Sequence, residues 1–336
     1  MSSCSDQGYC HEGGVQLNYA SYAGGNWMAK LPNATTLSQI SMPGSHDTMT
    51  LGGAEWGPIL LTQTMTLIEQ LYSGIRMVDM RLVHIGNVFV LNHGSFYLHA
   101  NFDDVLSTVA AFVRSNPGEV ILMRVKKEAS NFNGDQSKYN SQTFDQTFQA
   151  YEKKYAPLFW NNSGKSMNPS MQSLRGRIVV LQDFNGDVGA HTHGIKYSSF
   201  ATIEDNYSLD NDQLYSKWNA VRDNLNKAAS GPSTATYMTY LSGSGGSTPY
   251  FVASGKTLSG TYDSQQLTDV TPYNCSSDPY PDFFHTQCKL GFRYTYYKGT
   301  NMLVNDWLST RKQRVGIVMI DFPGGDLLEK IVGMNF

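Results

Sequence analysis

Polar side chains stand at the ends of successive apolar runs in this chain. One run leads into His46 and Asp47, the next ends in Asp79 and Arg81, and a third ends at His93. Two imidazoles can serve as general base and general acid, and a guanidinium can hold a phosphate through paired hydrogen bonds. Together these residue types predict phosphodiester cleavage by acid–base chemistry, with no metal ion and no cofactor.

Two later runs end in the same way, at Lys126 and at Asp321. Structural explanations exist for all of these residues: Asp321 can begin a turn, as can Asp47, and Lys126 can belong to a solvated run of charges. Asp79 and Arg81 can form an ion pair inside the protein, and a single histidine at a strand end is often structural. Their shared placement at successive strand ends nevertheless favours one common site.

The elements that must position these residues alternate along the chain. Helical spacing of apolar residues predicts helices at 61–73 and 102–115. Apolar, β-branched runs predict strands at residues 37–42, 77–82, 88–93, 120–126, 178–183, 237–241 and 315–321. This alternation predicts an α/β fold with a parallel sheet, and 336 residues suit a single-domain TIM-type barrel. The carboxyl ends of barrel strands surround the active site, so the polar residues should converge there.

Composition limits the partners. The formal net charge of −3 gives no electrostatic reason to expect nucleic acid. No run approaches the roughly 20 apolar residues that span a bilayer, so we expect peripheral, transient membrane contact by a monomer. We expect a polar arm over residues 1–25 and the barrel over residues 26–336, with a flexible loop at 242–248 and an insertion at 261–288.

The four cysteines form two local pairs, Cys4 with Cys10 and Cys275 with Cys288. Their even number and short spacing favour two disulfides, although four buried thiols are the alternative. Disulfides indicate an oxidising compartment. The polar start of the chain has no apolar run, so we expect a mature, secreted, extracellular protein whose signal peptide is absent.

Several motifs resemble, in order, the bacterial phosphatidylinositol-specific phospholipases C, a family with an X domain. These motifs are NWMAKLP at 26–32, LSQISMPGSHD at 37–47, GIRMVDMR at 74–81, NHG at 92–94, DDV at 103–105, NPGEVILMRVKKE at 116–128, RGRIVVL at 175–181, IEDNY at 203–207, the glycine pair at 245–246 and RVGIVMID at 314–321. The resemblance spans residues 26–328. It implies a distorted, incompletely closed (β/α)8 barrel.

The resemblance also implies a reaction, the cleavage of phosphatidylinositol to diacylglycerol and inositol 1,2-cyclic phosphate. It assigns His46 as the general base, oriented by Asp321. It assigns His93, coupled to Asp47, as the general acid for the leaving glycerol oxygen. Arg81 neutralises the charge that accumulates on the phosphorus.

Further residues match positions that recognise the head group. The resemblance implies that Asp79 holds the region around Arg81 in place. It also implies that Lys126 and Asp205 bind the inositol ring. Tyr207 is expected to form a flat platform against the ring. We expect phosphatidylinositol in membranes or micelles as the substrate, and glycosyl-phosphatidylinositol anchors as a further one.

The chain departs from the family at two places. The family strand that supplies a second inositol-binding arginine reads Gln182-Asp183 here. Either Gln182 or Asp183 binds the ring hydroxyls differently, or the head-group preference has changed. A loop tryptophan of some relatives is missing, which leaves Trp56 as the candidate for insertion into the lipid interface, or else as a packing residue.

The presence of Arg81 argues against a metal ion at this site. Calcium-dependent relatives have acidic ligands in place of this arginine, and a guanidinium repels a divalent cation. Two alternatives remain: a metal-dependent glycerophosphodiesterase or sphingomyelinase-D-like enzyme, and an inactive X-domain-like lipid-binding protein.

Overall fold

The computed structural model describes the barrel and most of its surroundings. The described residues are 3–4, 10–11, 23–51, 59–128, 136–162, 164, 166–187, 192–210, 213–255, 267–272, 286–289, 292–296 and 298–336. Trp56, the predicted lipid-inserting residue, lies outside them, and so does Cys275.

Eight parallel strands curl into an open barrel. They are β3 (Met42–Ser45), β4 (Met77–Ile85), β7 (Val120–Lys127), β8 (Arg177–Asp183), β9 (Ile195–Lys196), β10 (Thr202–Glu204), β12 (Tyr237–Tyr240) and β17 (Ile317–Ile320). Hydrogen bonds join them in the order β10-β12-β17-β3-β4-β7-β8-β9. Within the described residues, no bridge joins β9 to β10, although they are consecutive in the chain. The expected distorted, incompletely closed barrel is therefore confirmed.

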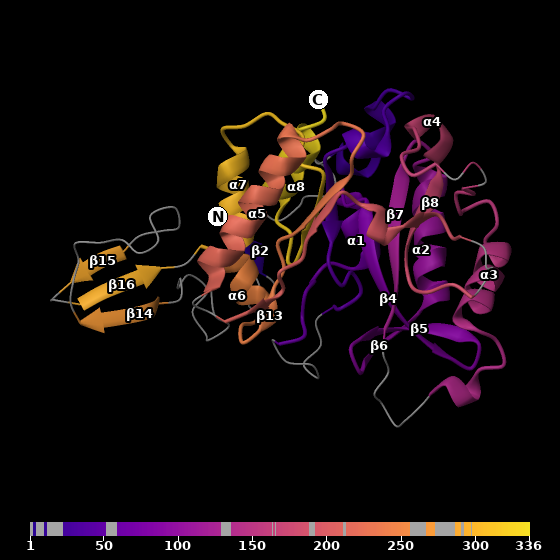
Figure 1. The fold of residues 1–336 in the computed structure, drawn as a ribbon, viewed down its shortest axis with the longest axis horizontal. Coiled ribbons are helices and arrows are strands. Elements are labelled where there is room, and N and C mark those ends of the chain that lie inside the picture. The colour runs from indigo at the N-terminus through magenta and orange to yellow at the C-terminus, as the bar shows by residue number, and fades with distance from the viewer. Residues whose placement is uncertain are drawn as a thin grey trace.

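Helices pack on the outside of the sheet, with α2 and α3 beside β7 and β8 and with α5, α7 and α8 on the other side of the molecule (Figure 1). The helices are α1 (Leu67–Tyr72), α2 (Phe102–Ser115), α3 (Phe144–Lys154), α4 (Met171–Leu174), α5 (Leu214–Ser230), α6 (Pro249–Ser254), α7 (Thr300–Leu308) and α8 (Gly325–Gly333). Short 3-10 turns occupy Ala23–Lys30, Leu37–Gln39, Gln136–Tyr139 and Tyr197–Ser199.

Helix α2 shows why local sequence is sufficient for some elements. Asn101 accepts a hydrogen bond from the backbone N–H of Asp104 at 3.1 Å, and Asp104 accepts one from the N–H of Asn101 at 3.0 Å. This reciprocal cap starts the helix. Residues at helical spacing, from Phe102 to Val113, face the core. The predicted boundaries 102–115 are confirmed.

The inner face of the barrel changes from apolar to polar along each strand. On β7, Leu122 lies in the barrel core, and Arg124 and Lys126 follow at every second position. On β4, Met77 is followed in the same way by Asp79 and Arg81. The outward-facing residues between them pack against the helices. Alternation of side chains along a strand thus places a polar layer at the carboxyl end of an apolar core.

His93 reaches this layer by a different route from the one expected. Its strand β5 (Val88–His93) is not a parallel barrel strand but pairs antiparallel with β4, so that expectation is wrong. Strand β4 extends to Ile85, beyond its pairing with β3 at Gly44 and Ser45. The β5 strand returns along the edge of β4 that β3 leaves free. The hairpin therefore brings His93 back to the level of the barrel mouth.

Other boundaries also differ. Residues 37–39 form a 3-10 turn, and the predicted strand at 37–42 begins at Met42 instead, because Gln39 closes a capping turn on the N–H of Thr36. The helix predicted at 61–73 covers only Leu67–Tyr72, because Thr66 and Glu69 form its cap. The strands predicted at 77–82, 120–126, 178–183, 237–241 and 315–321 are present with small shifts.

The remaining strands lie outside the barrel sheet or extend it. They are β1 (Ser3–Cys4), β2 (Cys10–His11), β6 (Phe96–Asn101), β11 (Ser208–Leu209), β13 (Ser244–Gly245), β14 (Leu267–Pro272), β15 (Thr286–Lys289) and β16 (Phe292–Tyr296). Strands β14, β15 and β16 form a separate sheet at one end of the molecule (Figure 1). The backbone pairs Cys4 with Cys10. The cysteine side chains lie outside the description, so both disulfides stay predictions.

Candidate active site

His46 and Asp321 meet because their strands are neighbours in register. Ile320 on β17 pairs with Ser45 on β3. The residues that follow them, Asp321 and His46, therefore lie side by side. The imidazole Nδ1 of His46 lies 2.8 Å from Oδ1 of Asp321. At Gly44 the inner face is crowded, because a Cβ atom there would lie 2.5 Å from the sulfur of Met319 and 2.8 Å from Cβ of Met77. Glycine therefore suits this position, two residues before His46.

The hydrogen bonds of His46 fix its tautomer. The Nη2 atom of Arg81 lies 2.8 Å from His46 Nε2. Because a guanidinium can only donate, Nε2 accepts and the ring proton is on Nδ1, donated to Asp321. Burial, together with the positive charge of Arg81, lowers the pKa of His46 well below its ordinary value. His46 is therefore a neutral imidazole with a basic Nε2 atom directed into the site.

Arg81 lies between two carboxylates. Its Nε atom is 2.6 Å from Oδ1 of Asp47, and its Nη2 atom is 3.6 Å from Oδ2 of Asp79. Burial by itself raises the pKa of Asp79, but the charges of Arg124 and Arg81 outweigh it and lower the pKa. Asp79 is therefore ionised and helps to hold the guanidinium in place.

Asp47 connects Arg81 to His93. Its Oδ2 atom lies 3.3 Å from Nε2 of His93, whose Nδ1 atom donates to the carbonyl oxygen of Leu60 at 3.0 Å. Because a carbonyl oxygen can only accept, the Nδ1 atom of His93 carries a proton, and its Nε2 atom faces the carboxylate of Asp47. Burial raises the pKa of Asp47. Asp47 thus connects Arg81 to a second imidazole, that of His93.

Two strained residues directly follow His46 and Asp321 in the chain. Asp47 has a φ of 43° and Phe322 has a φ of 48°, in the left-handed region that side chains other than glycine rarely adopt. Asn301 donates to the carbonyl oxygens of Asp321 and Phe322, at 2.8 and 3.2 Å. Such strain persists only where neighbouring contacts hold it, and it is frequent at functional sites.

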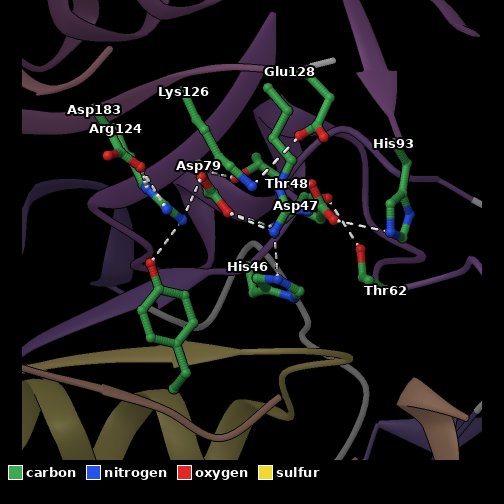
Figure 2. A network of polar contacts seen from close by, with 12 residues as sticks. His46, Asp47, Thr48, Thr62, Asp79, His93, Arg124, Lys126, Glu128 and Asp183 are labelled. Atoms are coloured by element: carbon green, nitrogen blue, oxygen red, sulfur yellow. Dashed lines mark hydrogen bonds and ion pairs between the residues drawn. The ribbon is translucent and has the colours of Figure 1, made fainter. Parts of the chain in front are cut away.

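Arg124 belongs to the same network, although the sequence analysis missed it. It lies beside Asp79 in the register of β4 and β7, and its guanidinium contacts Asp79 and Asp183. The missed signal was its spacing of two residues from Lys126, which places both on the inner face. Acidic and basic groups alternate in this network, in the order Asp183, Arg124, Asp79, Arg81 and Asp47, and Asp47 also contacts His93. Figure 2 shows Asp183 and Arg124 at one side of it and His93 at the other.

The predicted ring-binding residues lie around this network at different depths. Lys126 is about one third exposed, and its Nζ atom is 3.6 Å from Oε2 of Glu128. Asp205 and Tyr207 follow β10 at the open side of the barrel, and Tyr207 is 60% exposed. Asp205 is exposed, and the partial loss of solvent around its carboxyl group raises its pKa, against the opposing charges of Lys217 and Arg124. An exposed Tyr207 ring has room for a ligand against its face.

Gln182 is not positioned to bind a ring. Its amide nitrogen donates to the carbonyl oxygen of Phe184, and its oxygen accepts from the N–H of His193. Of the two β8 residues, only Asp183 remains a candidate for ring binding, and its side chain is 31% exposed. A changed head-group preference stays the other alternative.

Among the described residues, no three His, Cys, Asp or Glu side chains are arranged to hold a metal ion. No helix in the described part of the chain has the length and apolar character needed to cross a membrane.

Comparison with known proteins identifies relatives of the site-bearing half. Residues 34–183 match the family model of the phosphatidylinositol-specific phospholipase C X domain. A 1-phosphatidylinositol phosphodiesterase of Listeria monocytogenes is 34% identical over 164 residues, which cover 47% of this chain and 48% of the relative. One from Staphylococcus aureus is 31% identical over 190 residues, covering 53% and 59%. The chain thus spans about half the length of the curated relatives it matches.

The structural comparison extends further along the chain. The phosphatidylinositol-specific phospholipase C from Listeria monocytogenes superposes with a TM-score of 0.67 at 23% identity, covering 94% of this chain and all of that one. A mutant of the enzyme from Staphylococcus aureus gives a TM-score of 0.68 at 22% identity, covering 94% and 98%. These similarities show that the chain shares the open barrel fold.

Proposed function

We propose that this chain, whose residues 34–183 match the family model of the phosphatidylinositol-specific phospholipase C X domain, cleaves phosphatidylinositol without a metal ion. The products are diacylglycerol and inositol 1,2-cyclic phosphate. The observation that carries the proposal is the polar chain from Asp321 through His46, Arg81 and Asp47 to His93. It contains a base, a phosphate-binding cation and an acid in that order.

His46 begins the reaction as the general base. Its Nε2 atom takes the proton of the inositol 2-hydroxyl, and Asp321 stabilises the imidazolium that forms through the Nδ1–H hydrogen bond. Burial and the nearby Asp47 raise the pKa of Asp321, which makes its carboxylate a stronger acceptor for that hydrogen bond. The freed oxygen attacks the adjacent phosphorus and forms the new O–P bond.

Arg81 must change partner during this step. Without substrate its Nη2 atom donates to His46 Nε2, the same lone pair that removes the hydroxyl proton. A phosphate oxygen is a better acceptor for a guanidinium than a neutral imidazole is, because its charge strengthens the hydrogen bond. Phosphate binding therefore frees the base and places a positive charge where negative charge develops.

His93 completes the cleavage as the general acid. A proton on His93 Nε2, the nitrogen beside Asp47, passes to the glycerol oxygen as the O–P bond to diacylglycerol breaks. Asp47 also binds Arg81, so it aligns the acid with the phosphate-binding group. Lys126, Asp183, Asp205 and Tyr207 hold the head group at the barrel mouth, and Asp79 fixes Arg81.

The position of Arg81 supports a reaction without metal. The carboxylates of Asp47 and Asp79 are the ligands that a hard divalent cation prefers, but the guanidinium already lies between them. This arrangement favours the proposal over the metal-dependent phosphodiesterases considered above.

The decisive experiment is phosphorus NMR of a phosphatidylinositol digest that contains EDTA. A signal from inositol 1,2-cyclic phosphate is the expected result. Absence of cleavage with EDTA and recovery with calcium would identify a metal-dependent enzyme. Binding of phosphatidylinositol vesicles without turnover would identify a lipid-binding protein.

The setting of the reaction is part of the proposal. We infer a secreted, monomeric enzyme that contacts membranes or micelles of phosphatidylinositol transiently and also accepts glycosyl-phosphatidylinositol anchors. The two local cysteine pairs support the extracellular location. Recovery of the protein in the cells instead of the culture medium, with Cys4 and Cys10 not cross-linked in peptide mass spectra, would contradict it.

A further inference from the structure

Arg124 lies at the barrel mouth and has no role in the reaction steps described above. Its side chain is 8% exposed, on the inner face of β7. The guanidinium carbon lies 4.3 Å from the centre of the Tyr197 ring, which stacks against one face of the group. Its orientation is thus fixed by an aromatic ring as well as by hydrogen bonds.

Three neighbours use most of the hydrogen-bonding capacity of this guanidinium. Its Nε and Nη2 atoms donate to Oδ2 of Asp183, at 2.9 and 2.6 Å. Its Nη1 atom donates to Asp79 at 3.4 Å and to the hydroxyl of Tyr240 at 3.1 Å. A guanidinium has five N–H groups, so one N–H on Nη2 has no acceptor among the described residues.

Asp183 offers the complementary acceptor. Both bonds from Arg124 go to its Oδ2 atom, so its Oδ1 atom has no donor within the described part of the chain. Asp183 also lines a polar cavity of about 610 Å³, together with Lys127, Gln182, Lys196 and Ser198. The unused donor of Arg124 therefore lies beside an unused acceptor of Asp183, a residue that borders this open space.

The pair adjoins the reacting groups. Tyr240, which accepts from Arg124, packs its ring edge-on against His46 with ring centres 5.8 Å apart. Asp79 binds Arg124 through Oδ1 and Arg81 through Oδ2. A ring whose 2-hydroxyl meets His46 Nε2 would extend its other hydroxyls over this part of the network.

We propose that Arg124 is a specificity-determining residue that binds the inositol ring directly. Its free Nη2–H donates to one ring hydroxyl, and Asp183 Oδ1 accepts from the neighbouring hydroxyl. Adjacent donor and acceptor groups are the complement of a vicinal diol. Strand β7 thus supplies a ring-binding guanidinium to this chain, whose strand β8 has Asp183 in the corresponding region. The inference rests on the proposed function.

The test compares two substrates in Arg124→Met. One is phosphatidylinositol, and the other is the matching diacylglycerol phosphodiester of cis-1,2-cyclohexanediol, which keeps the attacking hydroxyl and lacks the other ring hydroxyls. We expect kcat/KM for phosphatidylinositol to fall about 10- to 100-fold more than that for the cyclohexanediol substrate, as for loss of a charged hydrogen bond. Myo-inositol should also become a weaker competitive inhibitor.

The matched control is Arg177→Met, an exposed arginine of β8 that donates to the carbonyl oxygen of Pro157. Its ratio between the two substrates should stay that of the wild type. Asp183→Asn is the second variant, used if Arg124→Met does not fold, and it should lower the same ratio.

Equal losses on both substrates would show that Arg124 only holds Asp79 in place, and no loss on either would show that it does nothing for the head group. Both results overturn the inference and leave the proposed function intact. A wild-type protein that cleaves neither substrate overturns both.

Discussion

His46 and His193 are two largely buried histidines with different protonation states. The difference comes from the group that contacts the second ring nitrogen. His46 donates from Nδ1 to Asp321 and accepts at Nε2 from Arg81. His193 has a carboxylate at each nitrogen, Glu152 at 2.8 Å from Nδ1 and Asp145 at 2.9 Å from Nε2. Two acceptors require two N–H groups, so His193 is an imidazolium, whereas His46 is neutral.

The pKa shifts follow the same logic. Burial lowers the pKa of both rings. At His46 the charge of Arg81 lowers it further. At His193 the hydrogen bonds and charges of Glu152 and Asp145 outweigh burial and raise the pKa above its ordinary value. Burial alone therefore does not decide the protonation of a histidine, because the charge at the second nitrogen can reinforce or reverse it.

The locations match these roles. His46 lies at the barrel mouth, where a basic lone pair can reach a substrate. His193 lies outside the barrel and joins the segment after β8 to α3, with its ring packed against Phe148 and Phe184. We therefore expect His46 to act in catalysis and His193 to act in stability.

The largest effect is expected on the rate of cleavage, when a histidine of the barrel mouth is replaced. His46→Ala removes the general base, and we expect cleavage of phosphatidylinositol to fall by at least about 10³-fold, within the range of general acid–base catalysis. His93→Ala should give a loss of similar size. The measurement is initial rate of cyclic phosphate formation, with circular dichroism to confirm folding. His193→Gln is the control and should keep most of the rate; near-normal turnover of either alanine variant would reject the mechanism.

Arg81→Ala tests what holds His46 neutral. Loss of phosphate stabilisation should lower kcat/KM by about 10²–10³-fold. Removal of the positive charge should also raise the pKa of His46, since Arg81 lowers it in the wild type.

The pH profile of kcat/KM shows the direction in which the pKa of His46 changes. The base must be neutral, so the wild-type rate should persist below about pH 6.5, the ordinary histidine value. In Arg81→Ala the acid side of the profile should move to higher pH. An unchanged profile, or a rate loss below about tenfold, would contradict the role of Arg81.

His193→Gln should lower stability with a defined pH dependence. The substitution leaves Asp145 and Glu152 without their shared cation, which should cost about 3 kcal/mol in the free energy of unfolding at pH 6. Because the folded-state pKa of His193 is raised, its contribution is fully present below the unfolded value near 6.5 and is lost as pH rises through the folded value.

The measurement is urea unfolding of wild type and His193→Gln at pH 6 and at pH 9. The difference in unfolding free energy should be larger at pH 6. A difference that is constant, or that grows with pH, would show that His193 is neutral in the folded protein.

The smallest effect is expected at an exposed ion pair. Lys154 and Asp103 join α3 to α2 at 2.6 Å, and both side chains are more than one third exposed. Asp103→Asn should change the free energy of unfolding much less than His193→Gln does, because water screens an exposed ion pair. Urea unfolding measures it on the same scale as His193→Gln, and an equal loss in the two variants would remove the distinction between buried and exposed pairs.

Elements with strong local signals were predictable. Helix α2 has its cap, its apolar spacing and its end within residues 101–117, and its boundaries were predicted correctly. Strands β7 and β8 were predicted nearly to the residue, because their continuous apolar runs are typical of strands that are covered on both faces. Residues 37–39 were not, because a side-chain cap competes locally with the extended backbone.

The residues of the site also differ in how well they could be predicted from the sequence. His46 and Asp321 were placed together because both end parallel strands, and the geometry confirms their contact. His93 was placed correctly for a wrong reason, since its strand is the return arm of a hairpin. Arg124 was missed because its importance comes from register with Asp79 and from contact with Asp183, which no local pattern records.

The sequence by itself determined the residue types of the site, the parallel strands that carry most of them and the kind of reaction they can perform, because periodicity and chemical identity are local properties. The tertiary structure decided which groups touch: Asp321 with His46, Asp47 with both Arg81 and His93, and Arg124 with Asp183. It also decided the protonation of His46 and of His193. Those outcomes depend on burial and on neighbouring charges from distant parts of the chain, and only the folded protein brings them together.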